Sequence, residues 1–292
     1  MTGPADLRTR AEDLAAPLPP LLAAADHLAS TVLLGAHGRR RTGTGDEFWQ
    51  YRQATPGDEA RMIDWRRSGR SDVHFVREKE WQAAQSVLLW VDRAQSMSFS
   101  SSGRLPTKSD RARLLALALA SLLVRGGERV GLTSLEMPPR SGEVQLLRLT
   151  QILADETAGD DYGVPDVRGI LPHSRAVFVS DFLGDVSVAE AAIAKATDRG
   201  VSGAILQILD PQEEAFPFDG RTIFESMGRS LSHETLKAGD LRGRYLERLA
   251  ERKDRLVRLA HATGWQYDCH HTDRSPSAAL LWLFRSLERV QH

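Results

Sequence analysis

The sequence predicts an α/β fold: a doubly wound, mostly parallel sheet with helices on both faces, preceded by an irregular β-rich N-terminal arm. From residue 86 onward, short apolar runs alternate with longer helical patterns, as expected of β–α–β units. The first run, residues 87–91, is apolar throughout, which is typical of a strand buried on both faces of a parallel sheet. Residues 35–80 instead combine glycines, arginines and short β-like pieces, so we predict that they form the arm.

The individual elements follow from local patterns along the chain. Residues 1–34 have a helical pattern that prolines at positions 17, 19 and 20 interrupt, which leaves 21–34 as a second helix. The arm holds two predicted strands, 48–51 and 73–76, rich in aromatic or β-branched residues. The main domain is predicted to hold strands at 87–91, 129–135, 176–179, 204–209, 221–225 and 265–270, and helices at 111–125, 144–155, 186–199, 241–263 and 277–290.

These patterns divide the chain into three expected parts. They are a helical segment over residues 1–34, the β-rich arm over 35–82 and the α/β domain over 83–292. Glycines after several of the predicted helices act as stop signals, which supports the alternation within the last part.

Composition excludes several classes of protein. With 41% hydrophobic and 26% charged residues, the 292-residue chain is that of a globular protein and not a disordered one. The net charge of −1 provides no global attraction to nucleic acid or to an anionic membrane. A single cysteine, Cys269, excludes an internal disulfide framework. No segment approaches the roughly 20 apolar residues of a membrane span, and the N-terminus lacks a signal pattern. We therefore expect a cytoplasmic protein that does not insert into a membrane.

Three predicted strands end in an aspartate, namely Asp92, Asp181 and Asp210. In α/β sheets, ligands bind beyond the carboxyl ends of the strands, and gathered carboxylates suit a hard cation. The alternative is that each aspartate caps the following helix or shapes a turn. Both interpretations stay open at this point.

The residues also suggest two other functions. Asp92 could be the nucleophile of a metal-dependent phosphohydrolase, although Ala94 stands where such enzymes carry a second aspartate. The arginines between residues 35 and 70, interleaved with Trp49, Tyr51 and Trp65, could form a nucleic-acid surface. Because acidic residues nearly match those arginines, we predict a solvated or internally paired face that binds no nucleic acid.

The adjacent histidines His270 and His271 do not predict a metal site. Neighbouring residues of a strand point to opposite faces of the sheet. We therefore expect the two imidazoles to face different surroundings.

The stretch from Pro56 to Arg66, Pro-Gly-Asp-Glu-Ala-Arg-Met-Ile-Asp-Trp-Arg, resembles the signature of the DUF58 family. The resemblance extends to Gly43–Phe48 upstream and to Asp92–Met97, Asp181 and later motifs downstream, so it spans roughly residues 35–288. It implies that the main domain is similar to a von Willebrand factor A domain. In the signature itself, the resemblance points to partner-binding residues, which are Asp58, Arg61, Asp64, Trp65 and Arg66.

Domains of the von Willebrand A type bind a divalent ion at a metal-ion-dependent adhesion site. Its pattern is Asp-x-Ser-x-Ser after the first strand, a threonine from a second loop and an aspartate from a third. By this resemblance Asp92, Ser96 and Asp181 are the candidate metal ligands, and Mg²⁺ is the candidate ion. Ala94 replaces the first serine, and Ser141 is the candidate for the second loop. The site is therefore expected to be degenerate.

The resemblance also implies a function. Members of the family are often encoded beside a MoxR-type AAA+ ATPase. We therefore expect a non-enzymatic protein-interaction module that serves as an adaptor of such an ATPase in assembling or remodelling a protein complex.

Overall fold

The structure is a computed structural model, and it describes residues 18–35, 48–55, 63–69, 73–79, 84–155, 160–226, 228 and 232–288. The chain forms two compact units. One comprises residues 1–36 and 85–292, and the other residues 37–84. The helical segment predicted at the N-terminus thus belongs to the same unit as the α/β domain.

The elements, in chain order, are α2 (Leu18–Gly35), β1 (Phe48–Gln53), α3 (Trp65–Ser68), β2 (Phe75–Lys79), β3 (Ser86–Val91), a 3₁₀ helix (Gln95–Ser98), α4 (Lys108–Arg125), β4 (Arg129–Leu132), α5 (Glu143–Ala154), β5 (Arg175–Ser180), α6 (Val186–Thr197), β6 (Ser202–Leu209), α7 (Pro211–Ala215), β7 (Thr222–Glu225), β8 (Ser232–Thr235), α8 (Gly239–Thr263), β9 (Gln266–His271) and α9 (Pro276–Glu288).

The larger unit is built on a parallel sheet. Among the described residues, five strands pair in the order β4-β3-β5-β6-β9, and every neighbouring pair is parallel. From β3 the chain passes through α4 to β4 on one side, and from β5 it passes through α6 to β6 on the other. The strand order therefore reverses between β3 and β5, which makes this gap the topological switch point of the sheet.

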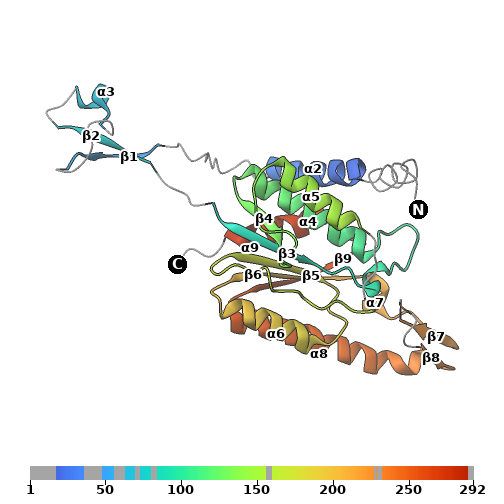
Figure 1. The fold of residues 1–292 in the computed structure, drawn as a ribbon. Coiled ribbons are helices and arrows are strands. Elements are labelled where there is room, and N and C mark those ends of the chain that lie inside the picture. Colours follow the sequence, from blue (N-terminus) through green and yellow to red (C-terminus); the bar gives the residue numbers. More distant parts are fainter. Residues whose placement is uncertain are drawn as a thin grey trace, which may run out of the picture. The chain divides into compact units, whose positions relative to one another are not determined.

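Helices cover both faces of the sheet, as Figure 1 shows, with α2, α4, α5 and α9 on one side and α6 and α8 on the other. Each face of the sheet has its own apolar core, and alternate residues of β3 point into the two cores. Leu89 and Val91 pack under α4, and Leu88 packs under α6. This alternation follows from the period of two in a strand. The predicted doubly wound α/β fold is confirmed.

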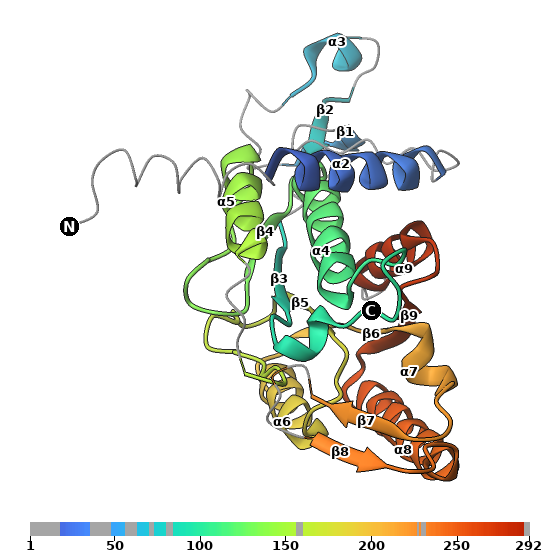
Figure 2. The ribbon, with the colours of Figure 1, turned by 90° about the vertical axis from the view of Figure 1, so that its right-hand side faces the viewer.

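Helix α2 forms a further layer outside α4, and Figure 2 shows it lying across that helix. Its Leu28 and Val32 are buried in the same core as α4. Asp26 accepts hydrogen bonds from Ser121 at 2.6 Å and Arg125 at 2.9 Å. Apolar burial and polar contacts thus both hold α2 to the main unit.

Some elements differ from the prediction, each for a local reason. Helix α4 begins at Lys108, three residues earlier than expected, because Thr107 and Asp110 form a capping box. The apolar run after Arg129 ends its strand at Leu132, where the chain turns back and Arg140 bridges Val130. The strand β8 was not predicted, since its residues are mostly exposed and polar.

The smaller unit contains an antiparallel ribbon of β1 and β2 and the short helix α3. Asp64 caps α3 by accepting from the Arg67 amide at 3.0 Å. The Phe75 amide donates to the Ser68 hydroxyl at 2.9 Å, which ties the end of α3 to β2. The predicted β-rich character of this segment is therefore present in its described residues.

Within the described part of the chain, no helix is long and apolar enough to cross a lipid bilayer.

Candidate functional site at the switch point of the sheet

The candidate site lies at the carboxyl ends of β3, β5 and β6. Asp92 directly follows β3, Asp181 follows β5 and Asp210 follows β6. All three are buried, with at most 2% of their surface exposed. The sheet order therefore brings the three predicted aspartates to one edge, and places Asp92 and Asp181 on the two sides of the switch point.

Asp92 is held by neutral donors. Its Oδ1 accepts from the Ala94 amide at 2.8 Å, and its Oδ2 accepts from the Ser180 hydroxyl at 2.6 Å. Burial raises the pKa of Asp92 to about 6, and the negative charge of Asp181 adds to that effect, while the two hydrogen bonds oppose it. The carboxylate thus keeps its charge near neutral pH only against a desolvation penalty.

The segment from Asp160 to Gly163 covers this carboxylate. The amides of Gln95 and Ser96 donate to the carbonyls of Asp160 and Asp161 at 3.1 and 3.0 Å. Gly163 lies so close to Asp92 that a Cβ on it would be 2.1 Å from Oδ1. Only a residue without a side chain fits there without displacing the carboxylate.

Asp181 is paired with a buried lysine that the sequence reasoning missed. The Lys108 ammonium donates to Asp181 Oδ2 at 2.8 Å and to Glu213 Oε1 at 2.5 Å, and Lys108 has no exposed surface. Burial works to lower the pKa of Lys108, but the charges of Asp181 and Glu213 outweigh it, so the pKa lies above the usual 10.5. Lys108 is therefore a permanent positive charge in the site.

Turn and capping contacts complete the edge. Asp181 Oδ1 accepts from the Leu183 amide at 2.9 Å, and Asp210 caps α7 in a capping box with Glu213. The Gln207 side chain donates to the Asp181 carbonyl at 2.8 Å and accepts from the Tyr267 hydroxyl at 2.7 Å. The aspartates thus have the capping and turn roles of the alternative interpretation, in addition to their contacts between strands.

The hydrogen bonds argue against a magnesium ion shared by Asp92 and Asp181. Each of their four carboxylate oxygens already accepts a hydrogen bond, one of them from Lys108. In the described ranges, no three His, Cys, Asp or Glu side chains are grouped so that they could hold a metal ion. The Ser96 hydroxyl is buried and has no hydrogen-bond partner among the described residues, so its oxygen could still coordinate an added ion. Magnesium binding by Asp92, Ser96 and Asp181 stays a prediction.

The second-loop candidate lies elsewhere. Ser141 follows Arg140, which bridges Val130 in antiparallel orientation, so the chain at Ser141 runs toward the amino end of β4. The carboxyl ends of the strands, with Asp92, are at the opposite edge of the sheet. The structure places Gly163 and the segment before it, and not Ser141, beside Asp92.

A cleft of about 320 Å³ lies beside Asp92 at this edge. Its walls combine apolar residues of β3, β4 and α5 with acidic groups, which include Glu136, Asp160 and Asp166. Val164 in its lining is 64% exposed, and Leu135, between two lining residues, is 65% exposed. Exposed apolar side chains around a concave surface at a switch point are typical of a binding site.

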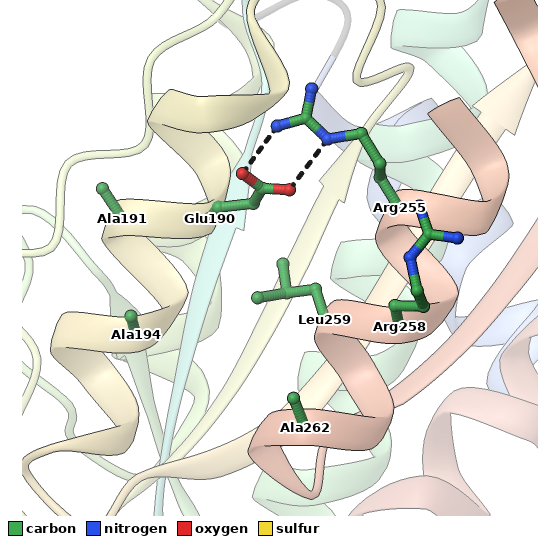
Figure 3. A pocket seen from close by; sticks show the side chains of 7 residues that line it. All are labelled: Glu190, Ala191, Ala194, Arg255, Arg258, Leu259 and Ala262. Carbon is green, nitrogen blue, oxygen red and sulfur yellow. Dashed lines mark hydrogen bonds and ion pairs between the residues drawn. The ribbon is translucent and has the colours of Figure 1, made fainter. Parts of the chain in front are cut away.

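A second hollow lies between α6 and α8 on the other face of the sheet. Figure 3 shows Arg255 of α8 reaching Glu190 of α6 across it, with hydrogen bonds of 3.1 and 2.7 Å. Ala194 and Leu259 contribute apolar surface to the lining. This surface ion pair joins two packed helices and brings no further reactive group to the switch point.

The two histidines face different partners, as expected. His270 Nε2 lies 3.0 Å from Arg111 Nη1, and His271 Nε2 contacts the Glu214 carboxylate. Burial lowers the pKa of His270 to about 4, and the positive charge of Arg111 adds to that effect. Because Arg111 can only donate, His270 is a neutral acceptor at this position.

The predicted partner-binding residues belong to the smaller unit. Asp64 caps α3, Trp65 is 59% exposed and Arg66 is exposed. The Trp65 ring meets His74 edge-on, with 5.4 Å between ring centroids. Asp58 and Arg61 lie outside the described residues, so the structure places only the second half of the signature.

Comparison with known proteins adds the family. Residues 50–255 match the family described as "Protein of unknown function DUF58", which confirms the resemblance seen in the sequence. The chain is similar to Uncharacterized protein Mb1516 of Mycobacterium bovis and Uncharacterized protein Rv1480 of Mycobacterium tuberculosis. Each is 26% identical over 279 residues, which cover 88% of this chain and 84% of the relative.

A similar solved structure is that of conserved hypothetical protein BatB from Bacteroides thetaiotaomicron. The match covers 71% of this chain and 100% of that chain, with 11% identity and a TM-score of 0.38.

Proposed function

This chain belongs to the DUF58 family, and we propose that it is a non-enzymatic protein-binding module with a von Willebrand A-like main domain. By the resemblance of its signature, the proposed partner is a MoxR-type AAA+ ATPase, for which the chain acts as an adaptor. The parallel sheet, its helices on both faces and the aspartates after β3 and β5 support the von Willebrand A-like character.

The cleft at the switch point carries the proposal. The cleft has a volume of about 320 Å³ and Val164 in its lining, and Leu135 lies between two of its lining residues; both side chains are about two-thirds exposed. A protein partner would gain binding energy by burying such side chains, while the acidic groups of the cleft would set specificity. We therefore assign the partner surface to the rim of this cleft.

The polar contacts at the edge also favour binding over turnover. The Ser180 hydroxyl donates to Asp92 but is only 2% exposed, and His270 accepts from Arg111 and is 5% exposed, so neither is open to a substrate as a nucleophile or a base. Asp92 is covered by Gly163, whereas a nucleophilic carboxylate must reach its substrate. These groups provide fixed shape and charge to a partner.

The test is a binding titration of the full chain with a purified MoxR-type ATPase of the same genome. Leu135→Asp and Val164→Asp should each weaken the affinity by about tenfold or more, because a charge replaces a buried apolar contact. Leu171→Asp is the matched control, since Leu171 is 44% exposed but precedes β5 at the amino edge of the sheet. Equal affinity of the rim variants and the wild type would remove the assigned surface.

A separate assay tests the non-enzymatic part. Incubation with p-nitrophenyl phosphate and Mg²⁺ should give no hydrolysis above background. Hydrolysis that Asp92→Asn abolishes would establish the phosphohydrolase function instead.

A further inference from the structure

We propose that the Lys108 ammonium takes the place of the divalent cation that the von Willebrand A-like resemblance implies, so that this carboxyl edge carries a built-in positive charge and works without a metal. The inference rests on the proposed von Willebrand A-like character of the main domain. It does not depend on which protein is the partner.

The position of the ammonium supports the proposal. Its nitrogen lies 2.8 Å from Asp181 Oδ2 and 2.5 Å from Glu213 Oε1, so one cation joins the carboxyl end of β5 to α7, the helix that follows β6. Asp181 is the residue that the resemblance assigns to the third-loop ligand. The ring of Phe99, with its centroid 5.8 Å from the ammonium nitrogen, closes another side of the charge.

The lysine and a metal ion would compete for the same oxygen. Mg²⁺ requires ligand oxygens at about 2.0–2.1 Å in near-octahedral arrangement. An ion at that distance from Asp181 Oδ2 would stand directly beside the ammonium, and the two like charges would repel each other. The second oxygen of Asp181 already accepts from the Leu183 amide, so the carboxylate cannot turn without losing that bond.

The backbone holds the lysine in place. Lys108 is the first residue of α4, and the capping box of Thr107 and Asp110 fixes the start of that helix. The Lys108 amide also donates to the Phe99 carbonyl at 3.2 Å. A side chain anchored at this point cannot diffuse away as an ion can, so the charge at the edge is independent of the metal concentration around the protein.

The substitution has a consequence for recognition. A metal at an adhesion site keeps a coordination position for an acidic side chain of the partner, whereas the Lys108 ammonium has no exposed surface. Its charge is already shared by two carboxylates of the same chain. A partner that docks here therefore binds without a metal bridge, and chelation should not release it.

The experiment is thermal unfolding of the full chain in EDTA and in millimolar Mg²⁺ or Mn²⁺. The wild type should have the same Tm in all three. Lys108→Ala and Lys108→Met should both lower the Tm by on the order of 10 °C, because they leave buried carboxylates without a counter-charge. Either cation should restore part of the loss in Lys108→Ala, which leaves space for an ion, but not in Lys108→Met, which fills it.

Lys253→Ala is the matched control. Lys253 pairs with Glu214, but its side chain is 22% exposed, so its loss should shift the Tm little and create no response to metal. A rise of the wild-type Tm in Mg²⁺ that Asp92→Ala abolishes would overturn the proposal. A Lys108→Ala variant that keeps the wild-type Tm, or whose lost stability neither cation restores, would overturn it as well.

Should the Lys108 variants not fold, calorimetric titration of Mg²⁺ into the wild type decides. The proposal predicts no saturable heat, and saturable binding that Asp92→Ala removes would refute it. Because no partner is present in these measurements, their outcome is separate from that of the ATPase titration.

Discussion

The Ser180 hydroxyl donates a 2.6 Å hydrogen bond to Asp92 Oδ2 and so joins β5 to β3 at the switch point of the sheet. The same hydroxyl accepts from the Phe182 amide at 2.9 Å, which fixes its direction. The buried Asp92 carboxylate therefore has two neutral hydrogen-bond donors, the Ser180 hydroxyl and the Ala94 amide.

Asp92→Asn should make the protein more stable at pH 7.5. The pKa of Asp92 is about 6 in the fold against 3.8 for the free group, so its ionisation costs about 3 kcal/mol of folding free energy. An amide avoids this cost: its oxygen can accept from Ala94 and its nitrogen can donate to Ser180. We expect the free energy of unfolding, measured in urea, to rise by about 1–3 kcal/mol.

The pH dependence checks the cause. Between pH 3.8 and about 6 the native state holds the proton that the unfolded state has lost, so the contribution of Asp92 to wild-type stability falls as pH rises through this window. The advantage of Asp92→Asn should thus be complete above this window and vanish near pH 4. Asp166→Asn is the control of opposite sign, because Arg168 lowers the pKa of Asp166. An Asp92→Asn protein no more stable than wild type at pH 7.5 would contradict the assignment.

The fold could be predicted from the sequence because its central strands are short apolar runs that alternate with longer helical patterns. Residues 87–91 and 204–209, which are apolar except for Gln207, lie within β3 and β6, where burial on both faces favours apolar residues throughout. The convergence of Asp92, Asp181 and Asp210 followed from the same reasoning, since carboxyl ends of parallel strands share one edge. The ribbon strand β8 escaped prediction because Ser232–Thr235 is polar and hardly buried.

The missing part of the candidate site was its positive charge. Lys108 is the first residue of α4, where the helix dipole disfavours a cation, and a lysine at this position was the only local indication of a nearby negative charge. Its role could not be predicted from the sequence, because its partners Asp181 and Glu213 are distant in the chain. Likewise, nothing local to Gly163 indicates that it lies over Asp92, because the close approach depends on the path of the preceding segment.

Gly163→Ala should displace the segment that covers Asp92. The new Cβ would meet the Asp92 carboxylate at 2.1–2.4 Å, and such overpacking costs about 1–3 kcal/mol. Hydrogen exchange should show the site of the change: the amides of Gln95 and Ser96, which donate to Asp160 and Asp161, should lose protection. Gly103→Ala is the control, because a Cβ there meets nothing within 4 Å. Unchanged protection of both amides would mean that the segment adapts without moving.

The contribution of His270 to stability should be lost on acidification. Its pKa is about 4 in the fold and 6.5 in the free group, with burial as the main cause. The unfolded state therefore binds the proton first, and the contribution of His270, complete above pH 6.5, is lost as pH falls toward 4. His270→Gln, whose amide oxygen can still accept from Arg111, should lack this contribution, so its stability relative to wild type should rise as pH falls from 6.5 to 4. His261→Gln, on the exposed face of α8, should show no such relative rise, and equal curves for both variants would exclude His270 as the source.

Trp65→Ala should weaken binding to the MoxR-type ATPase without lowering the Tm. Its ring is 59% exposed yet oriented by the His74 contact at 5.4 Å and by the cap that Asp64 places on α3. An exposed aromatic side chain in a fixed frame is the kind of group that dominates protein interfaces, so we expect a loss of about tenfold or more in affinity. Asp64→Ala should weaken binding in the same direction, because it removes the cap that positions Trp65. Leu236→Ala, which truncates an apolar side chain that is 74% exposed in the other unit, is the control for a general loss of surface hydrophobicity. Titrations that show equal affinity for Trp65→Ala and Leu236→Ala would exclude the signature segment from the interface and leave the cleft at the switch point as the proposed contact.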